Sequence, residues 1–445
     1  MNNRSVALIR FASVLVAALS GGSPLARAAC TKAIVASGLE NAAACVQSNA
    51  QPAPAGCVGI WTASLDGCEA SLLYAGDNLG TFGVPPQWNQ CGSQVRFTAA
   101  STPSYVTMRV DADGTHAIDV PFGYLSPDWS WVVTSSNDAL GQLEYTLQPA
   151  DGSGVPIHKS LSGSDADQGV GWAPNSHVFE ANTENTGTDM FDGTVIFDTS
   201  LNVVLDARGV FYEGENVAWR SDSSGLLESD QLVADGSFGT WLLETDGTLT
   251  KRSNAWGQMT LSPNDDDFAV QVRHYPARDD LWVGSISGAL PDTQIWHDAN
   301  TSPIYYPFFS PDGAHLLTSA GPVGGAFAGP LYTLGLDGNN LQKVSDAAAG
   351  NVAGNQYYWS PGGGAIAYKG NSIYVASPAG PTLSHLTQDT STATTLGGWS
   401  LGGKRVVWAG PPPVCNCVDS GPIFSDSFES CGTAAWDVTV GGAGP

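Results

Sequence analysis

The chain has 445 residues, and its 42% hydrophobic and 13% charged content supplies a large core and excludes a largely disordered protein. Its 53 glycines and 27 prolines indicate many turns and argue against long helices. A net charge of −25 repels phosphate backbones and anionic lipid surfaces, so we expect no nucleic-acid partner.

Residues 1–28 have the form of a secretory signal peptide. Arginines accompany a short apolar run, and Ala26-Arg27-Ala28 matches the small-x-small pattern found at cleavage sites. The run is too short to span a bilayer, and no later stretch approaches the length of a membrane span. We therefore expect a periplasmic or secreted monomer with no membrane insertion.

Eight cysteines fall into two groups, five before residue 92 and three after residue 414. In an exported chain this content favours disulfides. Because five and three are both odd, complete internal pairing needs at least one bridge between the groups, although the pairing itself is left open. We expect residues 29–94 to form a small disulfide-rich segment and the two ends of the chain to meet. The cysteines are Cys30, Cys45, Cys57, Cys68, Cys91, Cys415, Cys417 and Cys431.

A repeat centred on a turn occupies most of the chain. Stretches such as PFFSPDGAHLLTSA and YYWSPGGGAIAYKG share an aromatic residue, a Ser-Pro-Gly type of turn and a strand with alternating apolar residues. Copies recur every 40 to 50 residues, which is the period of a four-stranded propeller blade. The anchoring residues of the copies are Ser126, Ala173, Arg220, Ser262, Ser310, Ser360 and Ser400.

The two ends of the repeat region are incomplete in complementary ways. The last copy stops after two strands at Trp408, whereas residues 104–120 have the pattern of a third and a fourth strand. Joined, they would complete one blade and remove an open sheet edge. We therefore predict an all-β, seven-bladed β-propeller over residues 95–410, closed by N- and C-terminal strands. A Pro-rich linker and a Cys-containing tail follow at 411–445.

The repeat resembles the TolB-like propeller repeat, a relative of the Trp-Asp repeat families. The resemblance rests on Ser310-Pro311-Asp312-Gly313 and Trp359-Ser360-Pro361-Gly362-Gly363, and it extends over about residues 104–409. It implies a propeller fold and says little about function. Separately, the tail stretch IFSDSFESCGTAAWD resembles a short C-terminal segment of exported proteins of Gram-negative bacteria.

Two groups of residues are candidates for ligand binding. Trp129 and Trp131 lie two apart on an expected strand and so share a face, where exposed rings could stack on a sugar or a partner. Burial between blades is the other interpretation of this pair. Asp265, Asp266 and Asp267 stand in an expected turn and could supply part of a calcium shell, which needs six to eight oxygens. No other cofactor is indicated.

The sequence favours recognition over catalysis. It contains neither a Gly-x-Ser-x-Gly elbow nor a His-Glu-x-x-His pair, which predicts a non-catalytic scaffold for a protein or glycan ligand. The enzyme question stays open, with two alternatives: a carbohydrate-active lyase or hydrolase at the propeller axis, and a structural envelope component. Carboxylates or histidines at one mouth of the ring would favour the enzyme, and an aromatic patch would favour binding. Tryptophans that share one repeat slot should pack blades: Trp172, Trp219, Trp359 and Trp399.

Overall fold

The computed structural model describes most of residues 59–410. None of the eight cysteines is among the described residues, so the predicted disulfides lie outside them. The same holds for the signal peptide and the C-terminal tail. The described ranges are 59–64, 70–75, 79, 85–89, 92–101, 104–185, 190–212, 217–274, 279–288, 292–296, 300–303, 307–322, 328–345, 349–353, 356–380, 382–387, 394–400 and 403–410.

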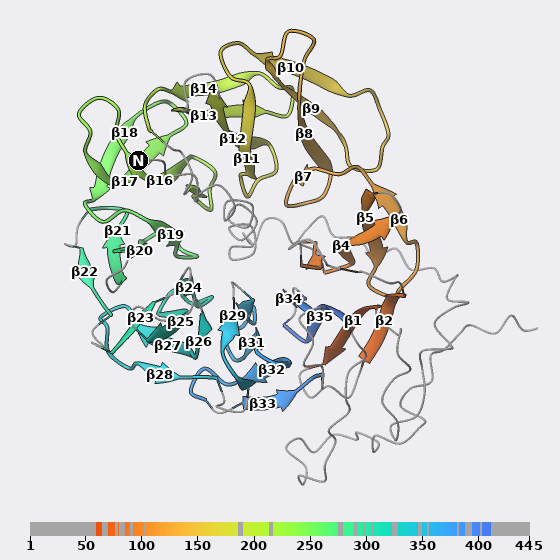
Figure 1. Cartoon of the computed structure of the whole chain (residues 1–445), viewed down its shortest axis with the longest axis vertical. Coiled ribbons are helices and arrows are strands. Elements are labelled where there is room, and N and C mark those ends of the chain that lie inside the picture. The colour runs from red at the N-terminus through yellow and green to blue at the C-terminus, as the bar shows by residue number, and fades with distance from the viewer. Residues whose placement is uncertain are drawn as a thin grey trace, which may run out of the picture.

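The described strands form eight antiparallel blades arranged in a ring, with first strands such as β7, β11, β19 and β24 on the side of their blades that faces the centre (Figure 1). Blade 1 is β34 (Thr395–Trp399), β35 (Arg405–Gly410), β1 (Gly59–Ser64) and β2 (Ala70–Ala75). Blade 2 is β3 (Gln87–Trp88), β4 (Gln94–Ser101), β5 (Ser104–Asp111) and β6 (Ile118–Val120). Blade 3 is β7 (Tyr124–Leu125), β8 (Trp131–Asn137), β9 (Leu143–Pro149) and β10 (Ile157–Leu161). Blade 4 is β11 (Ala166–Trp172), β12 (Val178–Asn185), β13 (Met190–Asp198) and β14 (Val203–Arg208).

The remaining blades complete the ring. Blade 5 is β15 (Val217–Trp219), β16 (Gly225–Gln231), β17 (Phe238–Glu244) and β18 (Leu249–Ser253). Blade 6 is β19 (Gln258–Leu261), β20 (Asp267–Val272), β21 (Asp280–Ser285) and β22 (Thr293–Gln294). Blade 7 is β24 (Phe308–Phe309), β25 (His315–Pro322), β27 (Leu331–Gly335) and β28 (Gln342–Lys343), with β23 (Thr301–Pro303) also on β25. Blade 8 is β30 (Tyr357–Trp359), β31 (Ile366–Lys369), β32 (Ile373–Ala376) and β33 (Thr382–His385), and β26 (Ala328–Gly329) pairs with β29 (Val352–Ala353).

The prediction of seven blades was wrong, because one copy of the repeat had been missed. Residues 104–120 do not complete the last copy; they pair with β3 and β4 in a blade of their own. The closing blade instead takes β1 and β2 from residues 59–75. In the missed copy Asn89 stands at the anchor, and Gln-Cys replaces the usual Pro-Asp, so the turn motif is hidden in the sequence.

Every blade has the same turn between its first and second strands. The N–H three residues after the anchor donates to the anchor carbonyl, and the anchor N–H donates to the carbonyl five residues on. Asn89 is the eighth such anchor, and its side-chain Oδ1 accepts bonds from the N–H groups of Ser93 and Gln94. The residue three after the anchor always has a left-handed φ, between 59° and 72°: Gly92, Trp129, Ser176, Ser223, Asp265, Gly313, Gly363 and Gly403.

Three of these left-handed residues link neighbouring blades. A left-handed φ costs a residue with a Cβ about 1–2 kcal/mol, which glycine avoids. In return, each of the three side chains accepts a hydrogen bond from a backbone N–H in the turn of the preceding blade. The pairs are Ser176 with Asp128, Ser223 with Asn175, and Asp265 with Ser221.

The four tryptophans of the shared repeat slot pack blades, which confirms that prediction. Each lies on the first strand of its blade, and its indole N–H donates to a carbonyl on the first strand of the preceding blade. The donor and acceptor pairs are Trp172 with Tyr124 (2.9 Å), Trp219 with Gly171 (3.2 Å), Trp359 with Phe308 (3.3 Å) and Trp399 with Tyr358 (2.9 Å).

The ring closes where β1 pairs with β35 along six residues. Trp61 lies opposite Trp408, and Trp408 is fully buried in the core of the closing blade. The Arg405 guanidinium donates to both the hydroxyl and the carbonyl of Thr62, each at 3.2 Å. The N-terminal and C-terminal strands are therefore held by one continuous sheet.

We expect Trp408→Ala to lower the free energy of unfolding by about 3–5 kcal/mol, the usual cost of truncating a fully buried large aromatic side chain. Urea denaturation followed by far-ultraviolet circular dichroism measures this loss. Trp256→Ala is the matched control, because this side chain is 41% exposed, and it should cost about 1 kcal/mol. Equal losses in both variants would contradict the described closing blade.

Candidate functional site

The two faces of the ring carry different connections. Because neighbouring strands in a blade are antiparallel, the turns between first and second strands lie at one end of the blade. The loops between second and third strands and the crossings to the next blade lie at the other end. We call these the turn face and the loop face. Within the described residues there is no helix long and apolar enough to cross a membrane.

The tryptophans predicted to bind a ligand lie on the turn face but do not share a strand. Trp129 occupies the left-handed position of its turn, with φ of 59°, and is partly buried. Trp131 begins β8 and packs against the core between blades 3 and 4. Both rings are thus placed by the turn and the core, and a ligand-binding role for them stays a prediction.

The three consecutive aspartates of blade 6 have different neighbours. The Asp265 carboxylate accepts bonds from the backbone N–H and the hydroxyl of Ser221 in blade 5. Asp266 accepts a bond from the Asn264 amide within the turn, at 2.6 Å. Burial and the charge of Asp266 raise the pKa of Asp267. No three His, Cys, Asp or Glu side chains of the described part are arranged to hold a metal ion, so the calcium hypothesis stays a prediction.

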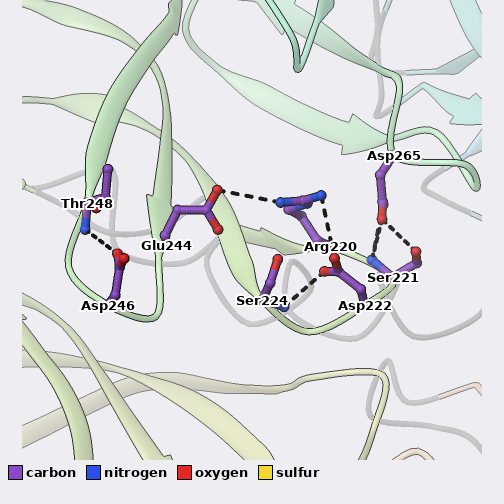
Figure 2. A network of polar contacts seen from close by, with 8 residues as sticks. All are labelled: Arg220, Ser221, Asp222, Ser224, Glu244, Asp246, Thr248 and Asp265. Carbon is purple, nitrogen blue, oxygen red and sulfur yellow. Dashed lines mark hydrogen bonds and ion pairs between the residues drawn. The ribbon is translucent and has the colours of Figure 1, made fainter.

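A polar network surrounds the turn of blade 5 (Figure 2). Arg220 stands at the anchor, and its guanidinium lies 3.5 Å from carboxylate oxygens of both Asp222 and Glu244. Asp222 also accepts the N–H of Ser224, and Asp265 reaches Ser221 from the next blade. Because the carboxylates of Asp222 and Glu244 lie beside the Arg220 guanidinium, its charge is balanced within the protein and is not free to bind an anionic ligand.

We expect Asp265→Ala to lower the free energy of unfolding by about 2 kcal/mol, because charge-assisted bonds to Ser221 are lost while the left-handed Cβ remains. Asp266→Ala is the control and should cost less than about 0.5 kcal/mol, since the Asp266 side chain is exposed and bonds to Asn264 of the same turn, while its backbone bonds are kept. Urea denaturation with calcium and with chelator measures both. A calcium-dependent stabilisation that both variants abolish would instead support a metal site.

Apolar side chains gather on the loop face around blade 5. The rings of Phe238 and Trp256 stack with centroids 4.4 Å apart and planes inclined by 29°. They are 40% and 41% exposed, and Tyr212 and Val233 are 38% and 40% exposed. The Tyr212 N–H bonds to the carbonyl of Gln231, which pairs with Phe238 across the hairpin, so these segments of backbone lie next to one another. We call Tyr212, Val233, Phe238 and Trp256 the aromatic patch.

The segment that carries Trp256 is fixed on both sides. The Thr240 hydroxyl donates to the carbonyl of Ala255 at 2.8 Å, and the Gly257 N–H donates to the Ser229 hydroxyl at 2.7 Å. Gly257 has a φ of 146°, and a Cβ there would lie 2.2 Å from the carbonyl oxygen of Gln271. A glycine is therefore required for the crossing to reach blade 6, and this crossing holds Trp256 against Phe238.

A group of buried carboxyls lies between blades 4 and 5. Glu180 on β12 is 3% exposed, and Glu228 and Asp230 on β16 are 0% and 4% exposed. We call these three residues the carboxyl cluster. The Trp219 indole donates to Glu180, and Thr194 contacts Glu228. Asp230 pairs with Gly239, next to Phe238, so the cluster extends from the interface toward the aromatic patch.

Burial governs the protonation of this cluster. It raises the pKa of Glu228 to about 8, while the contact with Thr194 acts in the opposite direction and the charge of Asp230 adds to the rise. Burial likewise raises the pKa of Glu180 well above its usual value, with a further contribution from the charge of Glu228. A bound molecule cannot touch groups that are 0–4% exposed, so the aromatic patch rather than the cluster can contact a ligand.

Sequence reasoning missed both the patch and the cluster. The cluster had a signal, because Glu228 and Asp230 stand two apart on a second strand and so share a face, where the corresponding residues of blade 6 are Val270 and Val272. The patch had none, since Tyr212, the hairpin with Val233 and Phe238, and Trp256 belong to three separate segments that only the packing of blades 4, 5 and 6 brings together.

Comparisons with known proteins concern the fold alone. No family model matches the chain, and no curated protein matches it. TolB from Acinetobacter baumannii is 15% identical over 58% of this chain and 63% of its own, with a TM-score of 0.32, so the chain spans less than two thirds of it. The β-propeller domain of the Trilobed protease from Pyrococcus furiosus is 11% identical over 70% and 96% of the two chains, with a TM-score of 0.41. An oligogalacturonate lyase in complex with manganese is 11% identical over 74% and 88%, with a TM-score of 0.42.

Proposed function

We propose that this protein is an exported, non-catalytic recognition propeller that binds an uncharged glycan at the aromatic patch. The half-exposed, stacked pair of Phe238 and Trp256 carries the proposal. A flat aromatic face held in place at low entropic cost is a platform on which sugar rings can stack. Exposed polar groups of Asp235 and Asn254 lie in the same loops and can bond to sugar hydroxyls.

The size of the aromatic patch and the net charge of the protein indicate which of the expected ligands fits better. A stable protein interface buries about 800 Å² on each partner, which four half-exposed side chains do not supply by themselves. A protein ligand is therefore the second candidate. The net charge of −25 disfavours anionic glycans and leaves neutral or basic ones.

The carbohydrate-active alternative needs an acid and a base that reach the substrate. Glu180 and Glu228 have raised pKa values suited to such a role, yet they are buried between blades 4 and 5. An enzyme would therefore have to expose them during the reaction. The geometry supports binding more directly than it supports bond cleavage, and an envelope role without a ligand leaves the exposed ring pair unexplained.

We expect Trp256→Ala and Phe238→Ala each to weaken binding of a neutral oligosaccharide at least tenfold, because each removes half of the stacking platform. A thermal-shift screen of neutral oligosaccharides finds the ligand, since saturation at 100 times Kd stabilises the native state by about 2.7 kcal/mol. Isothermal titration calorimetry then measures Kd for each variant.

Trp129→Ala is the matched control on the turn face and should leave Kd unchanged. Loss of binding in Trp129→Ala with normal binding in Trp256→Ala would place the site on the turn face instead. If no sugar binds and a captured protein depends on Trp256, the protein alternative is correct and the glycan proposal fails.

A further inference from the structure

The interface between blades 4 and 5 holds negative groups without a matching positive one. Glu180 and Glu228 are buried, and among the described residues no Lys, Arg or His forms an ion pair with either. The cations on nearby elements are engaged elsewhere. Arg208 pairs with Asp206, Arg220 lies between two turn carboxylates, and Lys251 lies 5.0 Å from the centre of the Trp241 ring.

Other titratable groups that face this interface are also acidic. Asp230 lies two residues beyond Glu228 on the same face of β16, and Glu184 lies four beyond Glu180 on β12. On blade 3, the charge of Glu180 contributes to the raised pKa of Tyr145. The Tyr145 hydroxyl donates a hydrogen bond to Asp167. Each ionisation at the interface therefore adds negative charge to negative charge.

The hydrogen bonds around Glu228 accommodate a proton on this carboxyl. The Thr194 hydroxyl has one hydrogen, yet Oγ1 is within bonding distance of both Asn182 Oδ1 (3.0 Å) and Glu228 Oε1. If Thr194 donates to Asn182, its contact with Glu228 is a hydrogen bond only when Glu228 is protonated and donates. Glu228 Oε2 has no partner among the described groups, which a neutral carboxyl tolerates better than a carboxylate.

We propose that Glu180 and Glu228 form a proton-operated latch that holds blades 4 and 5 together while both carboxyls are protonated, and loosens the aromatic patch when they ionise. Glu228 and Phe238 belong to the same hairpin of β16 and β17, so opening the interface moves the support of the patch. The latch does not depend on which ligand the patch takes. A bound cation is a poorer explanation, because no three metal-ligating side chains of the described part converge there.

The direction of the pH effect follows from linkage. The pKa of Glu228 is raised from 4.5 to about 8, so the folded state holds more protons than the unfolded state between these values. Stability from this group is complete below pH 4.5 and is lost as the pH rises through about 8. The equilibrium constant for unfolding should rise up to tenfold per pH unit for each such carboxyl.

Urea denaturation of the whole mature protein between pH 6 and 9 tests the latch. For the wild type we expect the unfolding constant to rise at least a hundredfold between pH 6.5 and 8, because each of the two carboxyls contributes at least tenfold. Glu228→Gln and Glu180→Gln keep the shape of the side chain without the ionisation, so each should reduce that rise at least tenfold. Asp337→Asn is the control, because Asp337 lies in an exposed turn of blade 7 and should keep the wild-type profile.

Hydrogen exchange followed by mass spectrometry gives a second readout that does not need the variants to fold. After correction for intrinsic rates, β16 and β17 should exchange faster at pH 9 than at pH 6, whereas β25 and β27 should not. The latch is overturned by a flat wild-type profile, or by equal pH slopes in the wild type and both Gln variants. Calcium that restores stability at pH 9, with loss of this effect in Glu228→Gln, would show that a cation rather than a proton neutralises the cluster.

Discussion

The pairing of β1 with β35 is the interaction on which the rest of the structure depends. In a ring of blades, each blade packs mainly against its two neighbours. One open junction would therefore expose the sheet surfaces of two blades and an unpaired strand edge. Here residues 59–64 and 405–410, far apart in the chain, share one sheet with Trp61 opposite Trp408. Closure converts eight small sheets into one body and fixes the relative positions of loops from different blades.

Within the closed ring, neighbouring blades are joined on the turn face by a repeated device. Three left-handed residues of these turns, Ser176, Ser223 and Asp265, accept a hydrogen bond from a backbone N–H in the turn of the preceding blade. Indole bonds such as that of Trp172 to Tyr124 join the inner strands. These contacts between blades lie on the turn face, whereas the aromatic patch lies on the loop face.

Most of the fold could be predicted from the sequence, because the repeated turn needs particular residues at fixed spacing. Ser310 and Ser360 accept a backbone bond with their hydroxyls, and glycine fits the left-handed position, so these copies were recognisable. Asn89 satisfies the same bonds with a different side chain, so its copy escaped notice and the number of blades came out one short. The site could not be predicted in this way, since Phe238 and Trp256 meet only through packing between blades 5 and 6.

We propose that the propeller binds its ligand on the loop face around blade 5. Hydrogen exchange with and without a bound oligosaccharide tests it most directly. We expect slower exchange in residues 232–238 and 254–257 on binding, and unchanged exchange in residues 126–131. Protection of 126–131 with no change in the two loop-face segments would contradict it.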